Sequence, residues 1–114
     1  MFTNWIDLLG TLKRSYTRME KTNPKMLSAY RELSAAQGSN GALDAKTREL
    51  IAIAVAVTTR CDGCISSHVA AAIKAGATEA EMSDAMGTAI ALNAGAAYVY
   101  SLHAMEAYAE LKGS

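Results

Sequence analysis

The two cysteines of this sequence lie in one short segment, Cys61-Asp62-Gly63-Cys64, and His68 follows one helical turn after the second of them. Two thiols at this spacing can close a disulfide with little backbone movement, and an imidazole four residues further along a helix can reach the second sulfur. The pattern favours redox chemistry. The structural alternative is that both cysteines are small buried residues beside a core histidine.

Composition indicates one domain and argues against nucleic-acid or membrane binding. The chain has 114 residues, and its 11 basic and 11 acidic residues cancel, so no net field attracts nucleic acid or anionic lipid. Asp7, Lys13 and Arg14 interrupt the first apolar positions, which is unlike a signal peptide or a membrane span. We therefore expect a cytoplasmic protein, where a lone CxxC pair is a cycling dithiol or a metal site rather than a permanent disulfide.

The apolar pattern predicts an all-α fold of about six helices in a compact bundle. Alanine is abundant after position 42, and Pro24 is the only proline. Apolar residues at three- and four-residue intervals predict a first helix that ends at Asn23. Pro24 suits the first turn of a second helix, which should stop near the glycine-containing loop 37–41.

The next two helices should form a hairpin with the CxxC pair at the start of its second helix. Asp44 is a good N-cap for a helix through about Thr58. The alternating run 51–57 also resembles a buried strand, but its length, its alanines and the cap favour a helix. The second helix of the hairpin should run from Asp62 to Ala75, with Gly76 as a left-handed cap.

The remaining sequence predicts two more helices. Thr78 and Glu81 form a capping box for a fifth helix, which should reach about Asn93 before Gly95 loosens the chain. A sixth helix would hold Tyr98, Leu102, Met105 and Tyr108. His103 on this helix is expected to be a core or interface residue, and not a catalytic one.

We expect a single domain over residues 1–114, with N-terminal helices in 1–37 and a catalytic core in 42–111. Many interior positions are alanine or glycine, so a domain of this size gains little apolar burial per residue. Oligomerisation would supply the missing burial. The alternative is a compact, alanine-rich monomer.

The hairpin predicts which side chains face each other. If the turn lies at Thr58 and Thr59, residues equally far from it on the two helices are opposite one another. The partner of His68 is then Glu49, although the two are far apart in sequence. Cys64 lies one turn from His68 on the same helix face, so acid, imidazole and thiol should converge.

Such a cluster can activate a thiol. A carboxylate orients the imidazole, and the imidazole takes a proton from the thiol directly or through water. Cys61 and Cys64 also lie in the first helical turn, where free N–H groups and the helix dipole favour a thiolate. Asp62 should face solvent, and Gly63 either leaves room for a substrate or backbone approach or merely allows a tight turn.

Three segments carry a resemblance to a known family: Leu43-Asp44-Ala45-Lys46-Thr47-Arg48-Glu49-Leu50-Ile51, Cys61-x-x-Cys64-x-x-x-His68, and Ala75-Gly76-Ala77-Thr78 with Glu81. Over roughly residues 24 to 97 the chain resembles the carboxymuconolactone decarboxylase-like family, and specifically its alkylhydroperoxidase D-like branch. Pro24 and Tyr30 also resemble the N-terminal pattern of that branch.

The resemblance implies an all-helical homotrimer or homohexamer that reduces hydroperoxides without a cofactor or metal. Glu49, Cys61, Cys64 and His68 match the proton relay and redox pair of the branch. It also implies an external dithiol reductant, either lipoyl or thioredoxin-like. The best-known members have an additional histidine immediately before the second cysteine, where this chain has Gly63. The decarboxylases that name the family generally lack the CxxC pair, so its presence argues against that activity.

We expect Cys64, the cysteine nearest the base, to attack the peroxide and Cys61 to resolve the sulfenic acid as a disulfide. The opposite assignment stays open because Cys61 is nearer the helix terminus. Three other functions also stay open: thiol–disulfide exchange or redox sensing without peroxide turnover, a zinc site made of Cys61, Cys64, His68 and Glu49, and a purely structural role.

Overall fold

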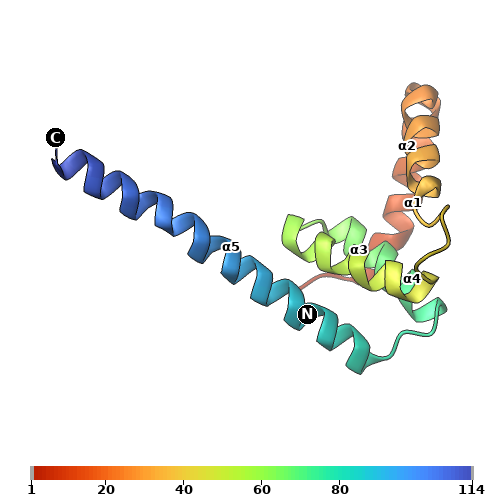
Figure 1. The fold of residues 1–114 in the computed structure, drawn as a ribbon. Coiled ribbons are helices and arrows are strands. Elements are labelled where there is room, and N and C mark those ends of the chain that lie inside the picture. Colours follow the sequence, from red (N-terminus) through yellow and green to blue (C-terminus); the bar gives the residue numbers. More distant parts are fainter. Residues whose placement is uncertain (1, 114) are drawn as a thin grey trace.

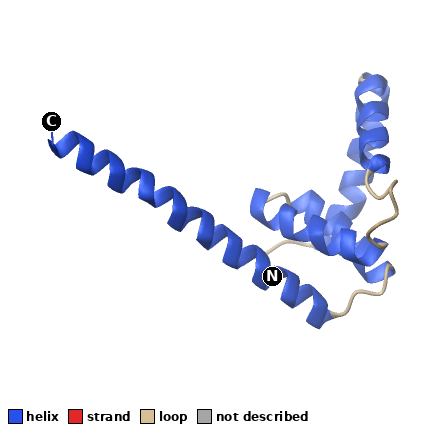
Figure 2. Cartoon of the chain, in the orientation of Figure 1, coloured by secondary structure: helices blue, strands red, loops and turns tan. Residues whose placement is uncertain are grey.

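The computed structural model describes residues 2–113, and within this range the backbone forms five α-helices and no strand. The helices are α1 (Trp5–Thr22), α2 (Pro24–Ala36), α3 (Ala45–Thr59), α4 (Asp62–Lys74) and α5 (Glu79–Gly113). Helices α3 and α4 form the centre, α1 and α2 project on one side, and α5 runs past α3 and projects on the other (Figures 1 and 2). The all-α prediction is confirmed, and residues 51–57 are helical.

The end of α1 and both ends of α2 agree with the prediction. The side chain of Asn4 caps α1 by accepting a hydrogen bond from the backbone N–H of Asp7 at 3.1 Å. Helix α1 ends before Asn23, and Pro24 is the first residue of α2. Proline is tolerated there because the first helical N–H groups have no partner within the helix. Helix α1 packs on both α2 and α4.

A tight turn joins α3 to α4. Arg60 has a left-handed backbone, with φ of 56°, and the N–H of Cys61 donates to the carbonyl of Ala56 at 3.0 Å, which closes the end of α3. Cys61 is also the N-cap of α4, because its sulfur accepts a hydrogen bond from the N–H of Cys64 at 3.2 Å. One residue therefore ends the first helix and begins the second.

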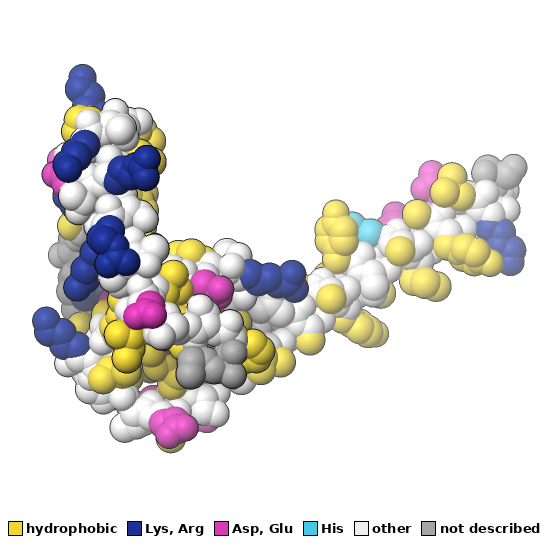
Figure 3. Space-filling model, turned by 180° about the vertical axis from the view of Figure 1, so that it is seen from behind, with side chains coloured by type: hydrophobic (Ala, Val, Ile, Leu, Met, Phe, Trp, Pro, Cys, Tyr) yellow, Lys and Arg dark blue, Asp and Glu magenta, His cyan; other side chains and the backbone are white. Residues whose placement is uncertain are grey.

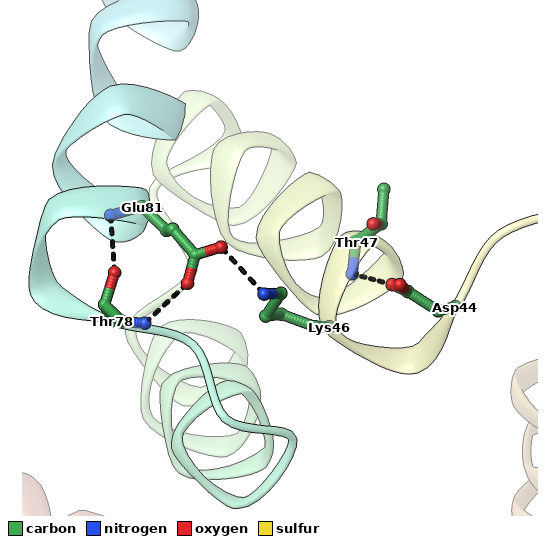
Figure 4. A network of polar contacts seen from close by, with 5 residues as sticks. All are labelled: Asp44, Lys46, Thr47, Thr78 and Glu81. Carbon is green, nitrogen blue, oxygen red and sulfur yellow. Dashed lines mark hydrogen bonds and ion pairs between the residues drawn. The ribbon is translucent and has the colours of Figure 1, made fainter.

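Polar contacts connect the start of α5 to the start of α3. Gly76, with φ of 89°, ends α4 as predicted. The N–H of Thr78 donates to Glu81 Oε1 at 2.9 Å and the N–H of Glu81 donates to Thr78 Oγ1 at 3.1 Å, which is the predicted capping box. Glu81 Oε2 also pairs with Lys46 Nζ at 2.8 Å, beside the Asp44 cap of α3 (Figure 4). This network holds α5 against the hairpin.

The same contacts shift the titration of both charged groups. The hydrogen bond from Lys46, followed by that from the N–H of Thr78, holds the pKa of Glu81 below its ordinary value of 4.5. The hydrogen bond to Glu81 raises the pKa of Lys46 above its ordinary value of 10.5. Each shift favours the charged form, as expected for an ion pair.

The prediction of a helix break at Gly95 was wrong. Helix α5 is continuous over 35 residues, so the predicted fifth and sixth helices are one and the chain has five described helices. A single glycine inside a helix costs only about 1 kcal/mol relative to alanine, and here good helix formers lie on both sides of it. No proline or capping residue follows Gly95, so the sequence has no further signal that would end the helix there.

The buried core is small and lies mainly within the hairpin. The fully buried apolar residues are Leu27, Ile53, Ala56, Ala72 and Ala89. Three of them belong to α3 and α4, and only Leu27 and Ile53 are large. The hairpin therefore holds most of the buried apolar residues, but large apolar side chains remain exposed on every helix, with the largest share on α5 and including Ile51 and Val55 of α3.

We predict that the Lys46–Glu81 pair makes stability depend on pH in the acid range. Because the folded-state pKa of Glu81 is lowered, its contribution is present above about pH 4.5 and is lost as the pH falls through the folded-state value. The free energy of unfolding, measured with urea between pH 3 and 7, should fall less steeply on acidification in Glu81→Gln than in the wild type. Lys46→Met should show the same reduction, since Lys46 is the main cause of the shift. Identical pH profiles for all three proteins would contradict this account.

Candidate redox site

Glu49 of α3 and His68 of α4 face each other across the hairpin. Nδ1 of His68 and Oε2 of Glu49 are 2.6 Å apart, and both side chains are partly buried, with 30% and 24% of their surface exposed. The sequence predicted this contact, but from a turn at Thr58 and Thr59, and that turn position was wrong. Both residues belong to α3, and the connection to α4 is made by Arg60 and Cys61. Because the carboxylate occupies Nδ1, Nε2 is the ring nitrogen left to exchange protons with another group.

The two cysteines are joined in a disulfide at the start of α4. Their Cα atoms are 5.2 Å apart, which is within the usual range for a bridge. Asp62 between them is exposed, as expected, and both cysteines are partly buried. The structure therefore presents the oxidised state of the pair.

Cys64 and His68 form a shared wall between two cavities. The first, of about 390 Å³, is also lined by Tyr16, Tyr30, Arg31, Gly63 and Ser67. The second, of about 510 Å³, is also lined by Leu43, Arg48, Ile51, Val55 and Thr59. Cys64 lines both cavities and Cys61 lines neither, so Cys64 is the cysteine closer to a small molecule in either cavity.

Tyrosines from the N-terminal helices complete the first cavity. Tyr16 comes from α1 and Tyr30 from α2, and burial, followed by the neighbouring Tyr30 hydroxyl, raises the pKa of Tyr16 above 10.0. Tyr16 and Tyr30 reach the cysteine because α1 packs on α4 and α2 packs on α1.

The structure explains the glycine between the cysteines. A Cβ atom built on Gly63 would lie 3.1 Å from Cδ2 of Leu12, because α1 packs closely on the first turn of α4. The backbone of Gly63 is not in the left-handed region, so a tight turn does not require this glycine. Close approach of another element is therefore its structural reason, and Leu12 occupies the space that a side chain at this position would need.

Two other expectations concern residues outside this cluster. His103 is exposed on the distal part of α5, where its ring contacts that of Tyr100 at 4.4 Å between centroids, so it is not a core residue of this chain.

Among residues 2–113, no group of three or more His, Cys, Asp or Glu side chains is arranged to hold a metal ion. No helix in this range is long and apolar enough to cross a membrane.

A model of the carboxymuconolactone decarboxylase family matches residues 24–107, and the chain therefore belongs to this family. An uncharacterized protein of Haemophilus influenzae is 59% identical over 112 residues, which cover 98% of this chain and 99% of that protein. An uncharacterized protein from the cox locus of Paracoccus denitrificans is 40% identical and covers 75% of this chain and 78% of its own. The family resemblance inferred from the sequence is confirmed.

Solved structures of similar proteins support the fold. The crystal structure of an apo carboxymuconolactone decarboxylase family protein from Legionella pneumophila has a TM-score of 0.74 and 32% identity, covering 93% of this chain and 95% of that one. A protein from Methanobacterium thermoautotrophicum has a TM-score of 0.67 and 30% identity, covering 73% of this chain and 93% of that one.

We predict that Gly63 and Leu12 are energetically coupled. Gly63→His should destabilise the protein by about 1–3 kcal/mol, because it forces an additional side chain into a packed contact. The cost should shrink by about 1 kcal/mol when Leu12→Ala removes the obstructing side chain. Urea unfolding of the two single variants and the double variant measures this coupling. Ala70→His, at an exposed position of α4, is the matched control and should cost less than about 1 kcal/mol. Additive effects of the two substitutions would show that Leu12 does not limit position 63.

Proposed function

We propose that this protein is a thiol-dependent peroxidase that reduces hydroperoxides through a Cys61/Cys64 dithiol–disulfide cycle. The observation that carries the proposal is the convergence of Glu49, His68 and Cys64 beside two cavities, with Cys61 bonded to Cys64. A peroxidase of this type needs a thiolate that a peroxide can reach, a proton relay and a second thiol within bonding distance. The α3–α4 hairpin offers a candidate for each: Cys64 at the edge of both cavities, the Glu49–His68 pair, and Cys61 bonded to Cys64.

The first step consumes the peroxide at Cys64. In the reduced protein His68 accepts the thiol proton through Nε2 while Glu49 holds the ring through Nδ1. The thiolate attacks one oxygen of the O–O bond, an S–O bond forms, and the alkoxide leaves with a proton from His68 as an alcohol. Cys64 is now a sulfenic acid, oxidised by two electrons.

The second step forms the disulfide seen in the structure. The Cys61 sulfur attacks the sulfenic sulfur of Cys64, an S–S bond forms, and the hydroxyl group leaves as water. An external dithiol, lipoyl or thioredoxin-like, then reduces the disulfide by exchange and is itself oxidised. We place this cycle in the cytoplasm and in a homotrimer or homohexamer, as the family resemblance implies.

We predict opposite behaviour for the two cysteine variants. In the reduced protein, Cys64→Ser should lose peroxide consumption, because the attacking sulfur is gone. Cys61→Ser should still react once with hydrogen peroxide or cumene hydroperoxide and should accumulate a sulfenic acid that dimedone traps. Stopped-flow oxidation and mass spectrometry of the adduct measure both outcomes. A dimedone adduct on Cys61 in Cys64→Ser, with none on Cys64 in Cys61→Ser, would reverse the assignment.

We also predict that Glu49 and His68 act as one relay. Glu49→Gln and His68→Gln should each slow oxidation of the reduced protein by about 100-fold or more, the usual contribution of a positioned acid–base group. The double variant should be hardly slower than either single variant, because both act on the same proton transfer. His103→Gln is the matched control, since His103 lies on the distal part of α5 and outside the cluster. Multiplicative losses in the double variant would mean that the two residues act independently.

Gly63 favours a second candidate, a thiol–disulfide exchange or redox-sensing protein without peroxide turnover. The position that carries an additional relay histidine in the best-known alkylhydroperoxidase D-like proteins is packed against Leu12 in this chain. An exchange protein would reduce a small disulfide substrate at the expense of dithiothreitol while leaving hydroperoxides unconsumed. The two candidates are therefore separated by measuring both substrates with the same reduced preparation.

A further inference from the structure

The second cavity beside Cys64 has the size and lining of a small-molecule site. Its volume of about 510 Å³ lies within the range of roughly 300–1,000 Å³ that is typical of ligand pockets. One face of α3 forms most of its wall, through positions 48, 51, 52, 55, 56 and 59. The first of these is Arg48 and the next four are Ile, Ala, Val and Ala. The cavity therefore has a cation at one end of an apolar wall.

Arg48 differs from the other arginines of the chain. It is partly buried, whereas Arg14, Arg18, Arg31 and Arg60 are exposed. Many of the basic side chains gather instead on the projecting helices α1 and α2 (Figure 3). Removing a guanidinium from water is unfavourable unless its charge gains a partner. The partial burial of Arg48 therefore raises the question of what it binds.

No carboxylate of residues 2–113 forms an ion pair with Arg48. Its Nη1 donates to the carbonyl of Leu43 at 2.8 Å, which uses one of the five N–H groups of a guanidinium. The acidic side chains close to it in sequence have other partners, since Asp44 caps α3 and Glu49 contacts His68. No acidic residue lines the second cavity. The site thus offers a positive charge to a ligand that carries a negative one.

The loop after α2 holds the guanidinium of Arg48 in place. A Cβ atom built on Gly38 would lie 2.5 Å from Cζ of Arg48, so the guanidinium packs directly on the loop backbone. Gly38 has φ of 77°, and Leu43, which accepts the hydrogen bond, follows at the other end of the same loop. A guanidinium held in this way loses little freedom when it binds, and its planar fork matches the two oxygens of a carboxylate.

The spacing between Arg48 and the redox pair suits a small molecule with two functional groups. Glu49, the next residue, contacts His68 across the hairpin, so Arg48 is nearly level with His68. Cys64 precedes His68 by four residues, which places its backbone about 6 Å further along the hairpin. A ligand that reaches both ends needs an anionic group and a reactive group separated by a short apolar segment.

We propose that the second cavity binds organic hydroperoxides that carry a carboxylate, and that Arg48 is the specificity-determining residue that binds this carboxylate. The hydroperoxide group then lies at Cys64, and the apolar atoms lie against Ile51 and Val55, which are 49% and 56% exposed in the chain alone. The carboxylate is unchanged while the hydroperoxide is reduced to an alcohol as described above. The assignment of the ligand as the oxidant rests on the proposed function, whereas the binding of a carboxylate does not.

An unreactive probe tests the site without turnover. Para-isopropylbenzoate and para-isopropylbenzamide differ in charge but hardly in shape. In NMR titrations of the oxidised protein, the benzoate should bind about 10-fold more tightly than the amide, the scale of a charge-assisted hydrogen-bonded pair. Arg48→Gln should abolish this preference, and Arg48→Lys should keep part of it, because lysine retains the charge but not the fork.

Arg18→Gln is the matched control for binding. It changes the net charge by the same amount as Arg48→Gln, and Arg18 is exposed on α1 and lines neither cavity. It should keep the wild-type preference for the benzoate. Equal affinities for the two probes in the wild type would overturn the proposal. So would a preference that survives Arg48→Gln, or one that Arg18→Gln removes to the same extent.

Turnover distinguishes failure of this inference from failure of the proposed function. Para-carboxycumene hydroperoxide and cumene hydroperoxide differ by one carboxylate. With dithiothreitol as reductant, kcat/KM of the wild type should be about 10-fold higher for the acid, and Arg48→Gln should lower it for the acid alone. An equal loss for both substrates would assign Arg48 a purely structural role and would overturn the proposal.

Two further outcomes separate the claims. Equal consumption of both hydroperoxides, unaffected by Arg48→Gln, would overturn the specificity assigned to Arg48 and leave the peroxidase function standing. Arg48-dependent binding of the benzoate, with neither hydroperoxide consumed by the reduced protein, would retain Arg48 as a carboxylate-binding residue and contradict the proposed function instead.

Discussion

The turn between α3 and α4 is the constraint on which the site depends. The left-handed backbone of Arg60 ends α3. The N–H of Cys61 donates to the carbonyl of Ala56 at that end, and the sulfur of Cys61 accepts from the N–H of Cys64 at the start of α4. No free linker remains between the helices, so their register is fixed. Adding or removing one residue here would rotate α4 by about 100° relative to α3 and carry His68 away from Glu49.

Signals local in sequence predicted most of this arrangement. These signals are the caps at Asp44 and Thr78, the proline at the start of α2 and the glycine at the end of α4. Each acts on the backbone N–H or C=O groups at one helix end, so its effect does not depend on tertiary context. The sequence placed Glu49 opposite His68 by counting from a turn at Thr58 and Thr59, but α3 continues through Thr59 and the turn lies at Arg60 and Cys61. The contact between the two side chains is present although the turn used to predict it lies elsewhere.

The features that could not be predicted depend on several elements at once. Gly95 suggested a helix end, but a glycine breaks a helix only when a cap or a turn follows, and neighbouring alanines and leucines decided otherwise. The first cavity beside Cys64 needs α1 packed on α4 and α2 packed on α1, and no periodicity in the sequence specifies that packing. The left-handed backbone conformation of Arg60 was also not predicted, because arginine has no preference for that conformation.

The candidate redox cluster and the stability of the chain have different physical origins. Glu49, His68 and both cysteines belong to one hairpin, whose buried side chains include Ile53, so a single chain can form their geometry. However, alanines make up much of that core, and each buries little apolar surface. Most large apolar side chains lie instead on exposed faces of α1, α2 and α5. The hairpin therefore sets where these groups lie, while its own small core buries little apolar surface.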